Sequence, residues 1–174
     1  MAISFYDASV GSYLQTLDAA QGFLQKSLDW GAANGVSAEQ LVEARLCEDM
    51  HPLRFQIQQI VFHSAGSMDA IRNGVLTFAH ERPKHTFAEL QALVAQTAAD
   101  LRALNPADVD ALEANEVAFR VPGKDDRLFT AAGFLLSFSM PNFHFHATTA
   151  YAILRNKGAP VGKMDFMGAL KLKA

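Results

Sequence analysis

The stretch PNFHFHATTAYAILRNKGAPVG, residues 141–162, decides the fold expected of this chain. Proline is tolerated in the first turn of a helix, and the apolar residues that follow recur with helical spacing. The stretch therefore predicts a helix from Pro141 to about Asn156. Asn142 and His146 are four residues apart, which places both side chains on one face of that helix.

The composition is typical of one helical domain. Half of the 174 residues are apolar, and the formal net charge is −3. A chain of this length buries a substantial core without disulfides or structural metals, so we expect a single domain over residues 1–174. Acidic and basic residues are mixed along the chain, which is not the charge pattern of a nucleic-acid-binding protein.

The cysteine content and the N-terminus indicate a cytoplasmic protein. Cys47 is the single cysteine, which excludes an internal disulfide and a thiolate metal cluster and fits a reducing compartment. The N-terminal residues lack a basic segment followed by an apolar run, and no stretch approaches the ~20 apolar residues that span a bilayer. We therefore expect neither export nor membrane insertion.

Apolar residues at three- and four-residue steps predict three more long helices. They span about residues 4–30, 52–74 and 86–104. The second opens at a proline and ends at Asn-Gly, and the third opens with a Thr-x-x-Glu capping box. A short helix over 37–47 follows from a second capping box, Ser-x-x-Gln.

The connections carry weaker signals. Residues 75–85 are expected to cross the bundle, with helical continuation through Phe78 as the alternative. Alternating apolar residues at 117–121, the turn PGKDD and residues 127–129 predict a small β-hairpin. Thr130 caps a final helical segment that Pro141 either kinks or separates from the last helix. The tail after Gly158 is expected to be irregular and to lie on the surface.

Two histidines are candidate metal ligands. His63 lies on the flank of the apolar stripe of the 52–74 helix, beside two glutamines, from where it can reach a pocket between helices. If that pocket borders His146, two imidazoles and Asn142 converge in the kind of place where helical bundles build metal sites. The alternative is that both histidines only hydrogen-bond neighbouring groups.

The other histidines are poorer candidates. His144 points roughly 160° away from His146 around the helix, which predicts a position at the surface or in a subunit contact. His80 and His85 fall in a polar connection, where solvated side chains are expected.

A second stripe of the 52–74 helix has two alternative interpretations. It consists of Phe55, Gln59, Phe62 and Gly66. These rings either pack under the hairpin or the tail, or form the seam of a homodimer.

Four segments resemble an uncharacterised bacterial family known as a domain of unknown function. They are DMHPL (49–53), TFAEL (86–90), PNFHFHATTAYAILRNKG (141–158) and GKMDFMG (162–168). That family is similar to the DinB- and YfiT-like four-helix bundles. The resemblance implies an all-α, up-down-down-up bundle with a long crossover, often dimeric. Better-known members of that superfamily bind a divalent metal through three histidines, and act as thiol-dependent transferases or isomerases or as metal-dependent hydrolases.

The resemblance also implies a ligand set. His146 matches the second histidine of the HxxxH pair in metal-binding relatives, Asn142 stands at the first, and His63 matches the third ligand. An amide oxygen is a weaker donor than imidazole for late first-row metals, so the expected zinc or nickel site is weak or lost.

We therefore expect an uncharacterised DinB-like protein with a polar inter-helix pocket, a degenerate metal site of a transferase or hydrolase. The alternative is a non-enzymatic bundle that binds a small ligand or serves as a structural homodimer.

Overall fold

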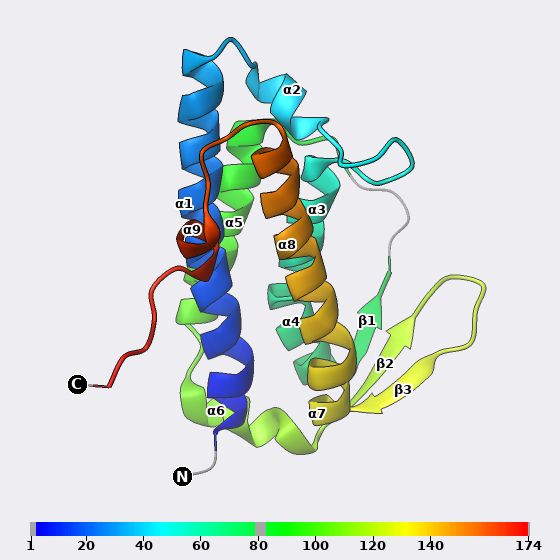
Figure 1. Ribbon diagram of the computed structural model, residues 1–174. Helices are drawn as coiled ribbons and strands as arrows, with labels where there is room; N and C mark the ends of the chain where they lie inside the picture. Colours follow the sequence, from blue (N-terminus) through cyan, green and yellow to red (C-terminus); the bar gives the residue numbers. More distant parts are fainter. Residues whose placement is uncertain (1–2, 79–82, 174) are drawn as a thin grey trace.

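Four helical arms surround the core, and a small sheet lies beside one end of the bundle (Figure 1). The computed structural model describes residues 3–78 and 83–173. The arms are α1 (Ser12–Ala33), α3 (Leu53–Phe62) continued by α4 (Ala65–Asn73), α5 (Phe87–Arg102) and α8 (Met140–Asn156). In Figure 1, α1 and α8 run upward while the other two arms run downward. The predicted up-down-down-up bundle is confirmed.

The inner faces of the arms are apolar, as the helical spacing predicts. Their burial supplies the main free energy of folding. The largest fully buried side chains include Tyr13, Leu17, Phe23, Leu24, Leu53, Ile57, Ile60, Phe134 and Phe143.

The first arm opens with a π-helical turn, Asp7–Gly11, and ends at Ala33. The following helix, α2 (Ala38–Val42), begins with the predicted capping box: the Ser37 hydroxyl accepts from the backbone N–H of Gln40, whose side chain accepts from Ser37 N–H. It is shorter than the predicted 37–47.

The second arm is broken, contrary to the prediction of one continuous helix. The break falls at His63 and Ser64, between α3 and α4. The Ser64 hydroxyl donates to the Ile60 carbonyl at 2.7 Å, and the Ser64 backbone N–H turns to Val61 instead. This local side-chain bond competes with the helical ladder. The apolar stripe continues across the break, so the spacing does not reveal it.

The crossover after α4 contains a strand that the sequence did not indicate. Gly74, at φ +82°, ends α4, and β1 (Val75–Thr77) follows, so helical continuation through Phe78 is wrong. β1 pairs in parallel with β2 (Glu116–Arg120), which pairs antiparallel with β3 (Arg127–Thr130). The predicted hairpin, β2–β3, is confirmed and is part of a three-stranded sheet.

The last arm remains helical across Pro141. It starts with α7 (Ala131–Phe134), passes through a π-helical turn at Leu135–Ser139 and continues as α8. In the π turn the Met140 N–H bonds the Leu135 carbonyl, five residues back. The wider turn ends at Ser139, two residues before the proline, whose missing N–H would interrupt an α-helical ladder.

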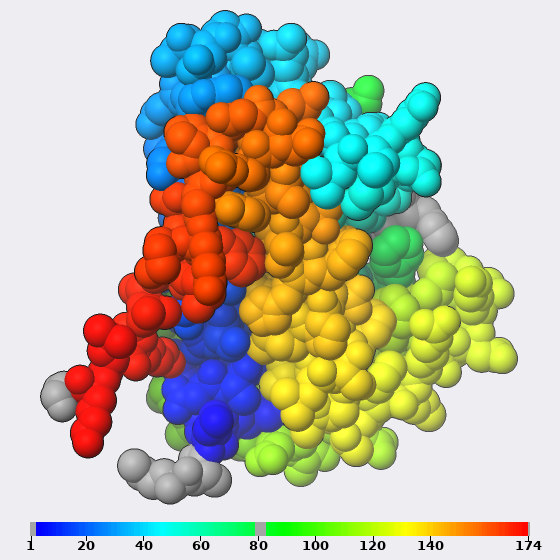
Figure 2. Space-filling model, viewed as in Figure 1, coloured from blue at the N-terminus to red at the C-terminus, as the bar shows by residue number. Residues whose placement is uncertain are grey.

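Three short helices complete the described chain. They are α6 (Pro106–Asp110), a 3₁₀ turn (Ala111–Ala114) and α9 (Lys163–Met167). The expectation of an irregular tail is therefore wrong in part, because α9 packs on α1, and Figure 2 shows this segment lying along α1 and beside α8. No helix in the described part of the chain combines the length and the apolar character needed to cross a membrane.

Candidate functional site

His63 and His146 face each other between α3 and α8. His63 is the C-cap residue directly after α3 and is 4% exposed, while His146 is half-buried in the middle of α8. Their ring centres are 5.8 Å apart and their planes differ by 11°. Phe138 borders His63, and Phe55 borders His146. The structure thus brings together the two predicted histidines.

Gln56 fixes the orientation and the tautomer of His146. The Gln56 Nε2 donates to the His51 carbonyl at 3.0 Å, and a carbonyl oxygen only accepts. The Gln56 Oε1 therefore faces the His146 Nδ1, 2.8 Å away, and that nitrogen donates. A neutral His146 thus has its lone pair on Nε2. Protein metal sites commonly have this arrangement, in which a second group binds the far nitrogen of the ligating imidazole.

Asn142 lies one turn before His146 and is half-buried. Its Nδ2 donates to the Phe138 carbonyl at 2.6 Å, which leaves Oδ1 as the acceptor end of the side chain. Asn142 shares a face of α8 with His146, as the spacing predicts. Its hydrogen bond goes to its own helical arm rather than to either imidazole.

Gln59 adds a buried hydrogen-bond donor to the face of α3 that carries Gln56 and His63. It lies between Gln56 and His63 on one helical stripe, at i+3 and i−4. Its side chain is 2% exposed, and its Nε2 has no hydrogen-bond acceptor among the described residues. A buried amide donor of this kind is suited to an acceptor atom of a bound ligand.

The spacing of the two imidazoles fits a shared metal ion. Nitrogen ligands about 2.1 Å from one zinc ion place their ring centres about 5–6 Å apart. Within residues 3–78 and 83–173, however, no cluster of three or more His, Cys, Asp or Glu side chains is arranged to bind a metal. A site built on this pair would therefore have two imidazole ligands and would be weak.

Sequence comparison identifies the family. The profile of a domain of unknown function, DUF1993, matches residues 5–167. The chain belongs to the DUF1993 family. A search of curated proteins found no match.

Structure comparison places this DUF1993 chain among DinB-like bundles. It is similar to the crystal structure of a DinB family member from Shewanella denitrificans, with a TM-score of 0.80 and 26% sequence identity. The alignment covers 97% of this chain and 94% of that chain. The resemblance inferred from the sequence is confirmed for the family and the fold.

The other histidines of this DUF1993 chain lie apart from the pair. His144 lines a shallow hollow with Pro141 and Phe145, and its partial burial lowers the pKa of its imidazole. His85 is half-buried rather than fully solvated, and its Nδ1 accepts from the Gln58 Nε2 at 2.8 Å. His80 lies outside the described residues.

Phe55 and Phe62 are half-buried and contact side chains of their own chain. Phe55 stacks on His51 with ring centres 4.0 Å apart, and Phe62 packs against Phe78, directly after β1, at 6.2 Å. Phe62 thus packs beside the sheet. A homodimer seam at these rings stays a prediction.

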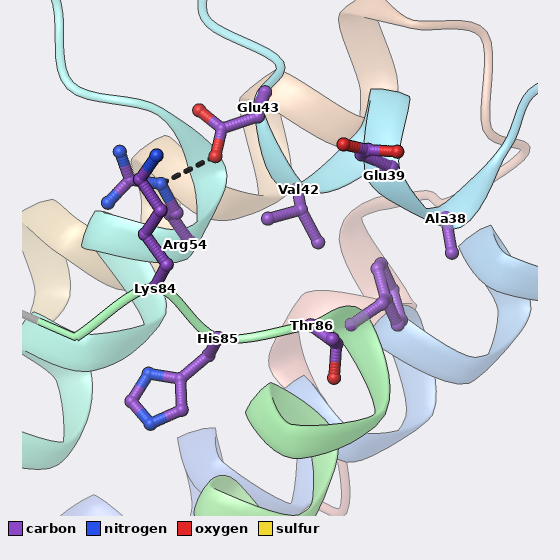
Figure 3. A pocket seen from close by; sticks show the side chains of 9 residues that line it. Ala38, Glu39, Val42, Glu43, Arg54, Lys84, His85 and Thr86 are labelled. Carbon is purple, nitrogen blue, oxygen red and sulfur yellow. Dashed lines mark hydrogen bonds and ion pairs between the residues drawn. The ribbon is translucent and has the colours of Figure 1, made fainter.

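A separate hollow of about 650 Å³ lies at the end of the bundle that carries α2. Figure 3 shows Glu39 of α2 and Glu43, directly after α2, on one side and Lys84 and His85 on the other. Glu43 is neutralised by Arg54, with the Nε–Oε1 distance at 2.7 Å. None of the three predicted ligands lines this hollow, so it is distinct from the histidine pair.

Sequence reasoning missed the supporting residues of the site. The sequence shows Gln56 and Gln59 as polar neighbours of His63, and Gln59 also as a member of the second stripe, but the spacing does not show that the Gln56 amide is fully bonded and that the Gln59 Nε2 is not. Such a distinction depends on the partner helix, which a single helical stripe does not contain.

Proposed function

We propose that this protein weakly binds a divalent late first-row metal, zinc or nickel, between His63 and His146, where α3 packs against α8. His63 and His146 are the principal ligands and the Asn142 Oδ1 is a third, weaker donor. The observation that supports this proposal is the facing imidazole pair, with the Nδ1 of His146 bonded to Gln56.

The histidine pair is proposed as the degenerate metal site of a transferase or hydrolase. An ion bound there would act as a Lewis acid toward an oxygen or sulfur of the substrate. In this proposal His63 and His146 serve as ligands rather than as acid or base. The buried Gln59 Nε2 would donate to an acceptor atom of the substrate and so orient it.

Metal binding by tag-free protein tests the proposal. After equilibration with the metal, elemental analysis should find about one zinc or nickel ion per chain. Calorimetry should detect metal binding by the wild type and none by His63→Ala or by His146→Ala. His144→Ala is the matched control, because it removes a half-buried imidazole from the same helix outside the pair. Circular dichroism checks that each variant is folded.

Asn142→His is the complementary gain-of-function variant. A third imidazole replaces the weaker amide and should tighten binding at least tenfold, or about 1.4 kcal/mol. Two results together would contradict the proposal. The wild type would remain metal-free, with an unchanged melting temperature after metal addition, and the Asn142→His variant would bind no metal either.

The second candidate function is non-enzymatic binding of a small ligand. The specific observation in its favour is the Gln59 Nε2, a buried donor that calls for an acceptor whether or not a metal is present. Metal-free wild type screened by calorimetry against small carboxylates and amides separates the two functions. Binding that Gln59→Leu abolishes and that zinc does not change would favour this candidate.

A further inference from the structure

Three buried hydroxyl groups form a hydrogen-bonded cluster that ends on the backbone carbonyl of His63. They belong to Tyr13 of α1, Ser67 of α4 and Ser139 at the end of the π turn before α8, and all three residues are 0% exposed. The Ser139 Oγ lies 2.7 Å from the His63 carbonyl oxygen, 2.8 Å from the Ser67 Oγ and 2.5 Å from the Tyr13 hydroxyl. Three separate arms of the bundle therefore meet at one serine.

The direction of each hydrogen bond follows from elementary chemistry. A carbonyl only accepts, so the single Ser139 proton is donated to His63, and Tyr13 and Ser67 must then donate to the Ser139 Oγ. Burial raises the pKa of Tyr13, which keeps its hydroxyl protonated as a donor. Ser139 thus uses one donor and two acceptor positions, its full capacity.

The His63 carbonyl lies at a helix end, where the usual hydrogen bond within the helix is missing. It stands at the C-terminal end of α3, where helical carbonyls lack partners in their own helix. The break after His63 removes the normal ladder bond, and Ser139 replaces it from another arm. Leaving such a buried carbonyl without a donor is unfavourable.

Ser139 also shares a stripe with the other members of the site. Ser139, Asn142 and His146 follow i, i+3, i+7 along the last arm. The serine therefore joins the backbone of one histidine to the helix face that carries the other. The π turn Leu135–Ser139 ends at this serine, directly before α8. Such turns are frequent at functional sites.

We infer that Ser139 is a positioning residue that fixes His63 opposite His146. This inference deepens the proposed function, since it concerns the same pair, but its principal test needs no metal. Tyr13 and Ser67 donate to the Ser139 Oγ, and the Ser139 proton goes to the His63 carbonyl, so the bond that positions His63 is the one from Ser139 itself.

The test compares Ser139→Ala with Ser27→Ala by NMR of the metal-free protein. Ser27 is a matched control, since it is also 0% exposed and its hydroxyl donates to a backbone carbonyl, that of Phe23, at 2.7 Å within its own helix. Ser139→Ala should lose the NOE between the ring protons of His63 and His146 and shift both ring signals. Ser27→Ala should retain the NOE and the shifts.

Two further variants separate positioning from general loosening of the core. Tyr13→Phe leaves the Ser139–His63 bond in place and should keep the NOE. Ser139→Cys retains the volume with a weak donor and should weaken the NOE, so it is the substitute test if Ser139→Ala does not fold. An unchanged NOE in Ser139→Ala or Ser139→Cys, or an equal loss in Tyr13→Phe, would overturn the inference.

A second readout links the inference to the proposed function while keeping the two distinguishable. Where the wild type binds zinc, Ser139→Ala should raise the Kd about tenfold, as the loss of a supporting residue does in metal sites, and Ser27→Ala should not. If the wild type binds no zinc but Ser139→Ala loses the NOE, the inference stands and the metal function falls. If zinc binds equally to wild type and Ser139→Ala, the inference falls.

Discussion

Gln56 and Gln59 are neighbours on α3 with different energetic roles. Both are nearly fully buried, at 3% and 2% exposure. Both ends of the Gln56 amide are bonded, to His51 and His146, whereas the Gln59 Nε2 has no acceptor in the described chain. A buried donor without a partner costs about 1–3 kcal/mol. A glutamine at position 59 therefore does not stabilise the fold, so stability does not explain why it is there.

Replacing each glutamine by leucine should shift stability in opposite directions. Gln59→Leu removes a buried donor and should raise the free energy of unfolding by about 1 kcal/mol, while Gln56→Leu breaks two bonds and should lower it by about 1–3 kcal/mol. Urea denaturation of the metal-free variants measures both. Equal destabilisation by the two changes would mean that the Gln59 amide is bonded after all.

At the scale of elements, the end of α8 is set by a close contact with α1. Gly158 has φ +104°, a left-handed conformation that residues with a side chain rarely adopt. A Cβ on Gly158 would come within 2.9 Å of the Trp30 ring. The glycine stop predicted from sequence is thus also a packing site between two arms.

Gly158→Ala should therefore cost more than the same change at a glycine in open space. We expect a loss of about 2–4 kcal/mol, the sum of the left-handed backbone penalty and the overlap with the indole. Gly123→Ala is the matched control, with φ +79° but nothing within 4 Å of the added carbon, and should cost about 1–2 kcal/mol. Urea denaturation compares them, and equal losses would exclude a steric role for Trp30.

At the scale of the whole molecule, the C-terminal segment joins the end of α8 to the side of α1. Asp165 of α9 accepts the Gly162 N–H at 2.6 Å and the Lys26 ammonium of α1 at 3.0 Å. The backbone N–H, and then the lysine, hold the pKa of this carboxyl below its ordinary value of 3.8. The homodimer expected from the family resemblance stays a prediction at this scale.

Asp165→Asn should destabilise the protein at neutral pH and much less in acid. A carboxyl whose pKa is lowered by folding contributes stability above its ordinary pKa, and that contribution is lost as the pH falls through the lowered value. The melting temperatures of wild type and variant should therefore differ at pH 7 and converge as the pH falls below 3.8. A difference that is independent of pH would show that the charge of Asp165 is not what stabilises the contact.

The sequence by itself determined the features whose causes are local. The capping boxes at Ser37 and Thr86 are complete in the structure, because each involves residues three apart. The helical stripes and the hairpin follow from spacing and turn chemistry in the same way. Helical geometry likewise placed Asn142 and His146 on one face of α8.

Only the tertiary structure decided the rest of the site. β1 exists because Val75 pairs with Ala118, far along the chain, so its own three residues carry no clear signal. The approach of His63 to His146 depends on the packing of α3 against α8, and the bond from Ser139 to the His63 carbonyl depends on a helix break and a π turn. These features arise from contacts between distant residues, which local spacing does not encode.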